Sequence, residues 1–285
     1  LILNSTSHRK ATGSRRKSPR RKKRGSSMGN SFHSLKMMLW RAGVVTLCAL
    51  LCYFIYIYVV APHSSRWRAL YGIENYPDGY SIRGIDISHY QGDINWNKLS
   101  KAKIGDESIC FVFIKATEGV QLLDENFNEN FYQAREYGLL RGAYHYFKPN
   151  VSAKEQARFF LKQVHLEEGD LPPVLDIEEI GNLTPKQLRE ATLTWMKEVE
   201  ARYHKPPILY TYYKFKKDYL NTPEFDRYPY WIAHYYVSSL TYNGKWKFWQ
   251  HTDCGRLDGI KGKVDLNIYN GSMYELRRLC LEDDF

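Results

Sequence analysis

Four acidic residues stand at or near the ends of short apolar runs: Asp86, Asp176, Glu178 and Asp265. Asp176 and Glu178 are two positions apart, so on an extended strand they point to the same face with Cα atoms about 6 to 7 Å apart. Two nearby carboxyl groups in unlike surroundings can have their pKa values driven apart, so that one keeps its proton while the other stays ionised. Glycosidic cleavage needs such a pair, because one group protonates the leaving oxygen and a negative group lies near the cationic sugar carbon. Two solvated acids at a surface strand end are the simpler alternative for this pair alone.

Aromatic side chains fall on or near the ends of the same runs. They are Tyr144, Tyr146, Phe147, Trp231, Tyr235 and Trp249. Flat rings at such positions can stack on the apolar faces of sugar rings, although each one could equally belong to the core. These aromatic residues favour a carbohydrate as the substrate of the acidic residues.

Eight short runs rich in β-branched and aromatic residues follow one another from Ser81 onward. They are GIDIS from Gly84, ICFVFIKA from Ile109, GAYHYF from Gly142, PVLDIE from Pro173, PILYTY from Pro207, YWIAHY from Tyr230, FWQHT from Phe248 and VDLN from Val264. The early gaps can hold a helix and two loops, whereas the last two starts are only 18 and 16 residues after their predecessors. This spacing predicts a mostly parallel, TIM-like α/β barrel whose final strands are joined by loops or hairpins. The C-terminal strand ends of such a barrel build its site, which would gather the four acids.

Helix signals lie between several of these runs. Ser152 to Glu155 and Thr184 to Gln187 both fit a capping box, and the second adds Pro185 at the first helical position. Gly138 follows the apolar-periodic segment FNENFYQAREY and suits the left-handed residue that closes a helix.

Charge is distributed unevenly along the 285 residues, whose formal net charge is +10. Residues 1–73 contain 14 Lys and Arg and no acid, so the remainder, with 27 basic and 31 acidic residues, is mildly acidic. The basic run between Arg9 and Arg24, set among Ser, Gly and Pro, predicts that residues 1–41 form a disordered tail. Nucleic-acid binding is the alternative function of this tail, and we expect none, because a positive flank beside an apolar segment explains the same residues.

Ala42 to Val60 forms an uncharged stretch of nineteen residues. As a helix it would be about 28 Å long, close to the ~30 Å hydrocarbon core of a bilayer. We therefore predict a transmembrane helix at 42–60 that contacts the lipid bilayer, with residues 1–41 in the cytoplasm and everything after Val60 across the membrane. A buried helix and a cleaved signal peptide are the alternatives, although Pro62 argues against cleavage. Residues 61–80 would be a linker and residues 81–285 the barrel domain.

The cysteine count excludes a disulfide framework, since only Cys110, Cys254 and Cys280 lie outside the apolar stretch. Cys254 with Cys280 is the pair that the sequence allows. No CxxC or HExxH spacing occurs, so we predict no metal site, and nothing in the chain calls for a cofactor.

Seven strings spread over about Ile82 to Met273 resemble the motifs of glycoside hydrolase family 25, the Chalaropsis-type lysozymes. In order they are GIDISHYQGDINW, FIKATEG, GAYHYF, PPVLDIE, PILYT, YWIAHY and FWQHTDCGRLDGIKGKVDLN. The resemblance implies a barrel of five strand-helix units followed by three strands, written (β/α)5(β)3. It also implies hydrolysis of the β-1,4 bond between N-acetylmuramic acid and N-acetylglucosamine in peptidoglycan, in remodelling or degradation of a cell wall. The enzyme would then be a single-pass protein of a bacterial inner membrane with its catalytic domain in the periplasm or outside the cell.

The resemblance also implies roles for individual residues. Glu178 matches the general acid, and Asp176 matches a partner carboxylate that either orients the substrate's 2-acetamido group or acts more directly on the anomeric carbon. Asp86 and Asp265 match further active-site acids. The expected substrate-binding residues are Tyr144, Trp231, Tyr235, Tyr210, Gln91 and Trp249. His251 and the pair Asp253-Cys254 depart from the family pattern near the expected sugar subsite, and none of these departures touches the four acids.

Two further functions compete with this interpretation. A chitinase-type barrel also ends a strand in DxE, but it carries additional acids where this chain has Val174 and Leu171. A membrane-tethered module that binds glycans without cleaving them is the second alternative, and the four intact acids argue against it. The sequence leaves the oligomeric state open.

Overall fold

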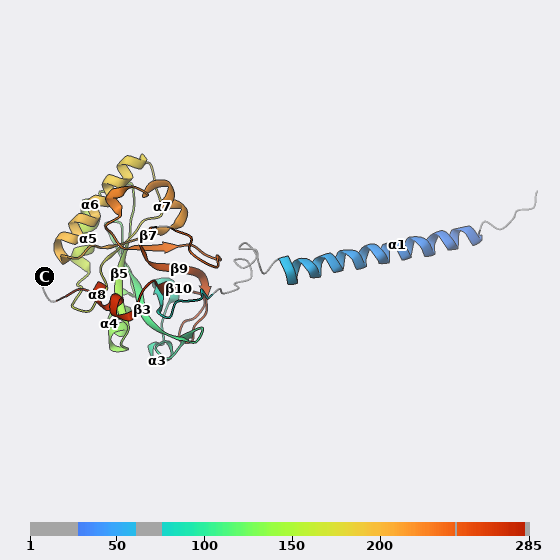
Figure 1. Ribbon diagram of the computed structural model, residues 1–285, viewed down its shortest axis with the longest axis horizontal. Helices are drawn as coiled ribbons and strands as arrows, with labels where there is room; N and C mark the ends of the chain where they lie inside the picture. The colour runs from blue at the N-terminus through green and yellow to red at the C-terminus, as the bar shows by residue number, and fades with distance from the viewer. Residues whose placement is uncertain (1–27, 61–75, 243, 283–285) are drawn as a thin grey trace, which may run out of the picture. The chain divides into compact units, whose positions relative to one another are not determined.

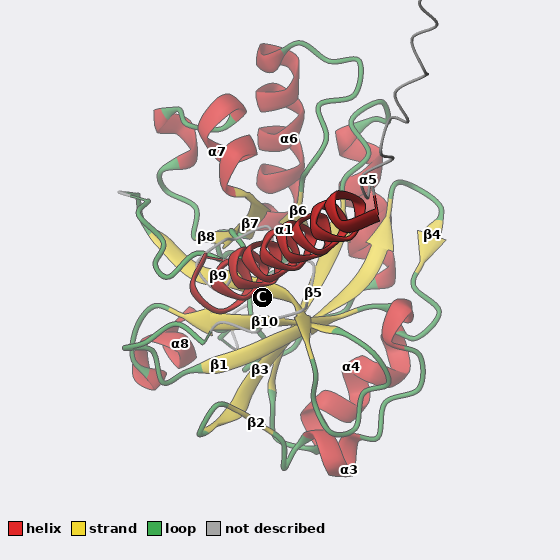
Figure 2. Cartoon of the chain, turned by 90° about the vertical axis from the view of Figure 1, so that its right-hand side faces the viewer, coloured by secondary structure: helices red, strands yellow, loops and turns green. Residues whose placement is uncertain are grey.

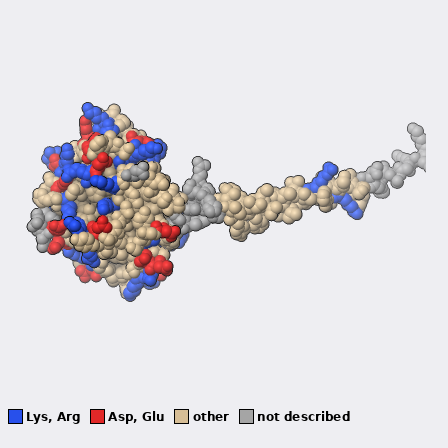
Figure 3. Space-filling view, viewed as in Figure 1, with Lys and Arg blue, Asp and Glu red and all other residues tan. Residues whose placement is uncertain are grey.

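The computed structural model describes residues 28–60, 76–242 and 244–282, and the chain divides into two compact units, Leu1–Ile57 and Tyr58–Phe285 (Figure 1). The described part of the N-terminal region is one helix, α1 (Met28–Ile55), followed by a π-helical turn, η1 (Tyr56–Val60). Phe32–Val60 is long and apolar enough to cross a membrane, with a mean hydropathy of 2.3 over its most apolar window. Figure 3 shows no acidic side chain on this helix. The length and composition of this segment agree with the predicted membrane span.

This helix begins before the predicted boundary at Ala42. Residues 28–41, which we expected to be disordered, are helical, and the rest of the predicted tail lies outside the described residues. The segment from Phe32 to Trp40 contains no Gly or Pro, and residues of high helix propensity such as Leu35 and Met38 extend the helix toward the N-terminus.

Each of the eight predicted runs forms a strand of one closed barrel (Figure 2). The strands are β1 (Arg83–Ile87), β3 (Glu107–Glu118), β5 (Leu140–Tyr146), β6 (Val174–Asp176), β7 (Ile208–Tyr212), β8 (Tyr230–Ala233), β9 (Trp246–Gly255) and β10 (Val264–Tyr269). Their order is β1-β10-β9-β8-β7-β6-β5-β3, and β3 pairs with β1 to close the barrel. Two short strands, β2 (Lys103–Ile104) and β4 (Leu122–Leu123), pair with β3.

All pairs in the barrel are parallel except those of β10, which runs antiparallel to both β1 and β9. Helices follow the first five barrel strands, and the described residues of the β8–β9 and β9–β10 connections contain no helix, as the spacing predicted. The helical elements are η3 (His89–Gln91), α3 (Trp96–Leu99), α4 (Phe127–Glu136), α5 (Ala153–Gln163), α6 (Pro185–Tyr203), α7 (Tyr213–Tyr219), η4 (Pro223–Phe225) and α8 (Met273–Leu279).

The helix ends follow the local sequence signals. Thr184 and Gln187 form a complete capping box at the start of α6, with Pro185 in the first turn. At α5 the Ser152 side chain accepts the backbone N–H of Glu155, which is one half of the predicted box. Gly138 has φ +75° just after α4, the left-handed conformation expected of a helix-closing glycine.

Side chains alternate between two cores along the barrel strands. Val112, Ile114 and Leu209 join the cluster that includes the helical residues Phe160 and Trp195 and therefore lies between barrel and helices. The residues between them on the strands, among them Phe111, Phe113, Val174 and Trp231, form a second cluster that fills the barrel interior. Gly84 and Gly142 make room there, since a Cβ on either would lie 2.4 Å or 2.6 Å from the rings of Phe111 and Phe113 respectively.

One prediction about the periphery of the barrel is wrong, and one pairing that the sequence left open does not occur. The end of the predicted linker belongs to the folded domain, because the Tyr80 ring packs on Trp246 and Trp249, and Pro77 accepts a hydrogen bond from the Arg83 guanidinium. Cys254 and Cys280 are free and buried rather than disulfide-bonded. The Cys254 thiol is hydrogen-bonded to the Thr252 hydroxyl. Cys280 packs in the cluster that fills the barrel interior, so the two thiols have different surroundings.

Candidate active site

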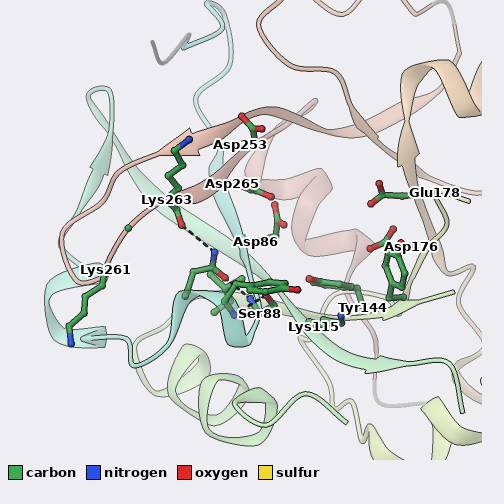
Figure 4. A pocket seen from close by; sticks show the side chains of 15 residues that line it. Asp86, Ser88, Lys115, Tyr144, Asp176, Glu178, Asp253, Lys261, Lys263 and Asp265 are labelled. Carbon is green, nitrogen blue, oxygen red and sulfur yellow. Dashed lines mark hydrogen bonds between the residues drawn. The ribbon is translucent and has the colours of Figure 1, made fainter. Parts of the chain in front are cut away.

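Side chains alternate in direction along the strands, and this alternation places the predicted acids inside the barrel, at the end where β1 and β6 have their carboxyl termini. Ile85 and Ile87 face the helices, so Asp86 faces the interior, and Val264 and Leu266 in the same way direct Asp265 inward. Val174 belongs to the interior cluster, and Asp176 follows two residues later on the same face. Figure 4 shows the four carboxyl groups around one cleft, with Tyr144 close to Asp176.

The cleft has a volume of about 520 Å³. It is lined by Asp86, Ile87, Ser88, Tyr90, Gln91, Lys115, Tyr144, Tyr146, Asp176, Glu178, Asp253, Lys261, Gly262, Lys263 and Asp265. Five of these side chains are acidic and three are lysines. Lys115 is already neutralised by Glu118, whose Oε2 lies 2.6 Å from the ammonium nitrogen.

Asp176 and Glu178 lie together as the sequence predicted, although β6 ends at Asp176 and Glu178 belongs to the loop after it. The backbone N–H of Ile177 donates to the Tyr210 carbonyl (3.1 Å), which continues the strand geometry, and its buried side chain faces the helices. The two acids therefore remain on the cleft side of the chain. Asp176 is only 6% exposed, whereas Glu178 is half-buried at the cleft surface.

Burial governs the protonation of this pair. Burial raises the pKa of Asp176 well above its usual range, and the charge of Glu178 raises it further. Burial also raises the pKa of Glu178, while the hydrogen bond from Asp176 opposes that shift. The pair therefore holds one proton well above the usual titration range of carboxylic acids, with Asp176 as its principal site in the free protein.

Gln250 organises the second pair of acids. Its Nε2 donates to Oδ2 of Asp86 (2.8 Å) and to Oδ2 of Asp265 (3.0 Å). Its Oε1 accepts the hydroxyl groups of Tyr210 and Tyr235, each at 2.7 Å. Because both tyrosines donate to the oxygen, the amide is held with its nitrogen toward the carboxylates.

Burial also raises the pKa values of Asp86 and Asp265. The pKa of Asp86 rises to about 6, although hydrogen bonds from Asn267 (2.7 Å) and Gln250 favour its ionised form. Burial and the charge of Asp86 raise the pKa of Asp265 to about 9. At neutral pH this pair therefore has one ionised carboxylate, Asp86, beside one protonated carboxyl, Asp265.

The predicted substrate-binding residues divide into three groups. Tyr144 and Gln91 line the cleft. Tyr210 and Tyr235 hold Gln250, and Trp231 is buried with its indole N–H donated to Asn267 (2.7 Å), so these three support the acids. Trp249 lies in the core between barrel and helices, fully buried, with its N–H donated to the His234 carbonyl.

Sequence reasoning missed several residues of this site. Gln250 and Asn267 hold Asp86 directly, and Tyr90, Lys261 and Lys263 line the cleft. The sequence did contain a signal for Asn267. In the run VDLN, Asn267 stands two residues after Asp265, so on a strand the two side chains must point to the same face.

The family model described as glycosyl hydrolases family 25 matches residues 85–260, most of the barrel domain. The chain belongs to glycosyl hydrolase family 25. The family resemblance and the barrel fold predicted from the sequence are thereby confirmed.

Several family 25 proteins and other relatives are similar to this chain. An uncharacterized protein of Escherichia coli O6:H1, YegX, is 48% identical over 202 residues, which cover 70% of this chain and 74% of YegX. Lysozyme M1 of Streptomyces globisporus is 34% identical over 226 residues, covering 71% of this chain and 72% of that enzyme. Among solved structures, a bacterial lysozyme from Streptomyces coelicolor has a TM-score of 0.65 and 33% identity, covering 71% of this chain and 98% of that one. The chain is accordingly a glycoside hydrolase.

Proposed function

We propose that this family 25 enzyme is a peptidoglycan muramidase that hydrolyses the β-1,4 bond between N-acetylmuramic acid and N-acetylglucosamine. The observation that carries the proposal is the Asp176–Glu178 pair, two neighbouring carboxyl groups whose pKa values are raised by burial at the side of a cleft of about 520 Å³. Relatives named lysozyme and N,O-diacetylmuramidase support the same activity.

Glu178 is suited to protonate the leaving oxygen because it is the more accessible member of the pair. A bound sugar covers Glu178, and this desolvation raises the pKa of its carboxyl, so the shared proton moves toward it. Transfer of the proton to the glycosidic oxygen accompanies cleavage of the bond between that oxygen and the anomeric carbon. Water then adds to the anomeric carbon, and its proton returns to Glu178.

Asp176 supports either role that the family offers for the partner carboxylate. Its Oδ1 is buried and accepts no hydrogen bond from the described residues, so it is available to a substrate group such as an acetamido N–H. Oriented in this way, the acetamido carbonyl oxygen would attack the anomeric carbon. Once its proton has passed to Glu178, the Asp176 carboxylate could instead stabilise the positive charge on that carbon directly.

Replacement of Glu178 by glutamine tests this function. Because general acid catalysis contributes about 10²- to 10⁴-fold, E178Q should lose most of the release of reducing ends from purified peptidoglycan at an unchanged melting temperature. Glu190 provides the control, since it is an exposed carboxylate on α6, pairs with Lys186 and is absent from the cleft lining. E190Q should retain activity. Equal activity of E178Q and wild type would remove Glu178 from the acid role.

A glycan-binding module without catalysis is the second candidate, and the structure gives it no specific support. A module that only binds sugars has no need for several buried carboxyl groups with raised pKa values. Absence of reducing-end release by the wild-type protein would favour this candidate.

The apolar helix supports a location for the activity. Phe32–Val60 is suited to anchor the chain in a bacterial inner membrane, with the basic N-terminal side in the cytoplasm and the barrel on the far side. The enzyme would then act on glycan strands near the membrane. Protease digestion of spheroplasts tests this topology, because only a barrel outside the membrane would be degraded.

A further inference from the structure

Two lysines line the end of the cleft opposite the Asp176–Glu178 pair. Figure 4 shows Lys261 and Lys263 on that side, with Asp86 and Asp265 between them and the pair. Neither ammonium group forms an ion pair with a carboxylate of the described residues, in contrast to Lys115, which pairs with Glu118. Both lysines also follow residue 260, where the match to the family model ends.

The loop that carries these lysines, residues 256–263 between β9 and β10, is held firmly in place. The backbone N–H of Asn95 donates to the Gly259 carbonyl at 2.8 Å. Gly259 lies so close to the start of α3 that a Cβ would be 2.6 Å from the Asn95 carbonyl oxygen. On the other side, the Gln91 Nε2 donates to the Lys263 carbonyl (3.2 Å), which fixes the backbone of the loop beside the cleft lining.

An exposed aromatic ring, that of Tyr90, also lines the cleft, and Tyr90 directly precedes Gln91, whose side chain donates to the Lys263 carbonyl. Tyr90 is 81% exposed, and its ring lies 4.2 Å from the His89 ring, centroid to centroid. His89 is itself fixed by Asp124, whose Oδ2 lies 2.8 Å from Nδ1. A large ring that is supported from one side and open on the other is suited to stack on a sugar.

The rest of the cleft is acidic and would repel an anion. Besides the four catalytic-site acids, Asp253 lines it and accepts the hydroxyl of Tyr236. Lys261 and Lys263, which form no ion pair with the described residues, would offset the repulsion of an anion at their end of the cleft. They favour a substrate that is neutral at the scissile bond and negatively charged at some distance from it.

We propose that Lys261 and Lys263, beside Tyr90, form a subsite for the carboxylate groups that peptidoglycan bears on its muramic acid residues. This proposal rests on the proposed function and specifies which form of the substrate the cleft prefers. In the alternating glycan only muramic acid carries an acidic substituent, which is either the lactyl carboxylate itself or the carboxylates of the peptide attached to it. The subsite therefore selects peptidoglycan over neutral polymers of N-acetylglucosamine.

The test compares the full-length protein with the double variant K261A/K263A on purified peptidoglycan. Partly exposed ion pairs are worth up to about 1 kcal/mol each, so the double variant should raise KM by roughly 3- to 30-fold while kcat changes little. K261R/K263R should restore the KM, because it restores the charge. K154A is the matched surface control and should behave as wild type, since Lys154 lies outside the cleft and pairs with Glu198.

Two further measurements identify the anion and the nature of the interaction. Glycan strands freed of peptide by an amidase retain only the lactyl carboxylate; a KM effect that persists on them assigns the subsite to that group, and one that disappears assigns it to the peptide. Added salt should raise the KM of the wild type more steeply than that of the double variant.

The outcomes separate this proposal from the proposed function. If the wild type releases reducing ends and the double variant has the same KM, the lysine subsite is refuted and the muramidase function stands. An increased KM that K261R/K263R fails to restore would also contradict the proposal, because it would point to a disturbed loop. If the wild type releases none, the proposed function itself fails.

Discussion

Gln250 is the residue on which the arrangement of Asp86 and Asp265 depends, because its amide contacts both carboxyl groups and two tyrosine hydroxyls. Q250M keeps the side-chain length and removes all four hydrogen bonds. We expect the free energy of unfolding to fall by roughly 1–3 kcal/mol, since the buried partners lose a hydrogen bond.

The pH profile distinguishes a positioning role of Gln250 from a merely structural one. Hydrogen bonds from Gln250 lower the pKa of Asp86, so their loss should raise this pKa above about 6. If the reaction uses ionised Asp86, the acid limb of kcat then moves to higher pH. Y210F leaves the Tyr235 hydroxyl on the amide oxygen and should shift the limb less. An unshifted limb in active Q250M would contradict the positioning role.

The sequence predicted that the four acids would lie together, as they do, but it missed the residues that hold them, for a physical reason. Burial of an acidic side chain is costly, so acids that end apolar strands indicate a functional site even when the sequence does not show which face of the strand is buried. Trp249 and Gln250 are adjacent and must face opposite sides of β9. The sequence alone did not determine which of them faces the barrel interior, and the structure assigns that side to Gln250 and the helix side to Trp249.

At the scale of elements, the loop between β9 and β10 depends on two glycines that differ only in their surroundings. Gly259 and Gly262 have φ values of +99° and +94°. A Cβ on Gly262 would meet nothing within 4 Å, whereas on Gly259 it would lie 2.6 Å from the Asn95 carbonyl oxygen and 2.7 Å from the Leu99 nitrogen.

Alanine substitutions at these glycines should therefore have unequal effects. G262A should cost about 1 kcal/mol of unfolding free energy, the usual penalty of a left-handed non-glycine residue. G259A should cost clearly more and should raise KM for peptidoglycan, because the loop must move away from α3. Chemical denaturation of both variants measures the difference, and equal losses would contradict the close packing of Gly259.

The element boundaries that the sequence predicted well have local causes. Pro185 and the Thr184 capping box fix the start of α6 within the sequence itself. The start of α1 was predicted too late, because the hydrophobicity pattern reports which residues can enter a bilayer, whereas helix formation extends to any neighbouring residues of good propensity. The two free cysteines depend on tertiary packing and leave no local signal.

At the scale of the whole molecule, the buried acids reduce stability at alkaline pH. Asp86 and Asp265 have an ordinary pKa of 3.8 and folded values of about 6 and about 9. Between pH 4 and 9 the folded state therefore binds more protons than the unfolded state, so the free energy of unfolding falls as the pH rises.

Removal of one carboxyl should relieve part of this effect. D265N keeps an acceptor for Gln250 and should stabilise the protein at pH 8 by roughly 1–3 kcal/mol, while at pH 4, where Asp265 is protonated, the difference should be small. Thermal melting of both proteins at the two pH values gives the comparison. A D265N variant that is equally destabilised at pH 4 and pH 8 would contradict the raised pKa.

The segregation of charge and apolar residues along the chain also belongs to this scale. Composition alone distinguished three parts of the chain: a basic N-terminal region, an apolar helix and a mildly acidic barrel domain. The reason is that a charged segment prefers water, whereas an apolar helix of this length is suited to a bilayer. The closure of the barrel by antiparallel β10 required the structure, since strand pairing is a long-range property.

The most direct measurement is mass spectrometry of the fragments that the wild-type enzyme releases from peptidoglycan, after borohydride reduction of their new ends. A carboxyl pair that protonates the oxygen between muramic acid and N-acetylglucosamine predicts reduced muramic acid at every new end. Reduced N-acetylglucosamine in that position, or intact strands after digestion, would contradict the account.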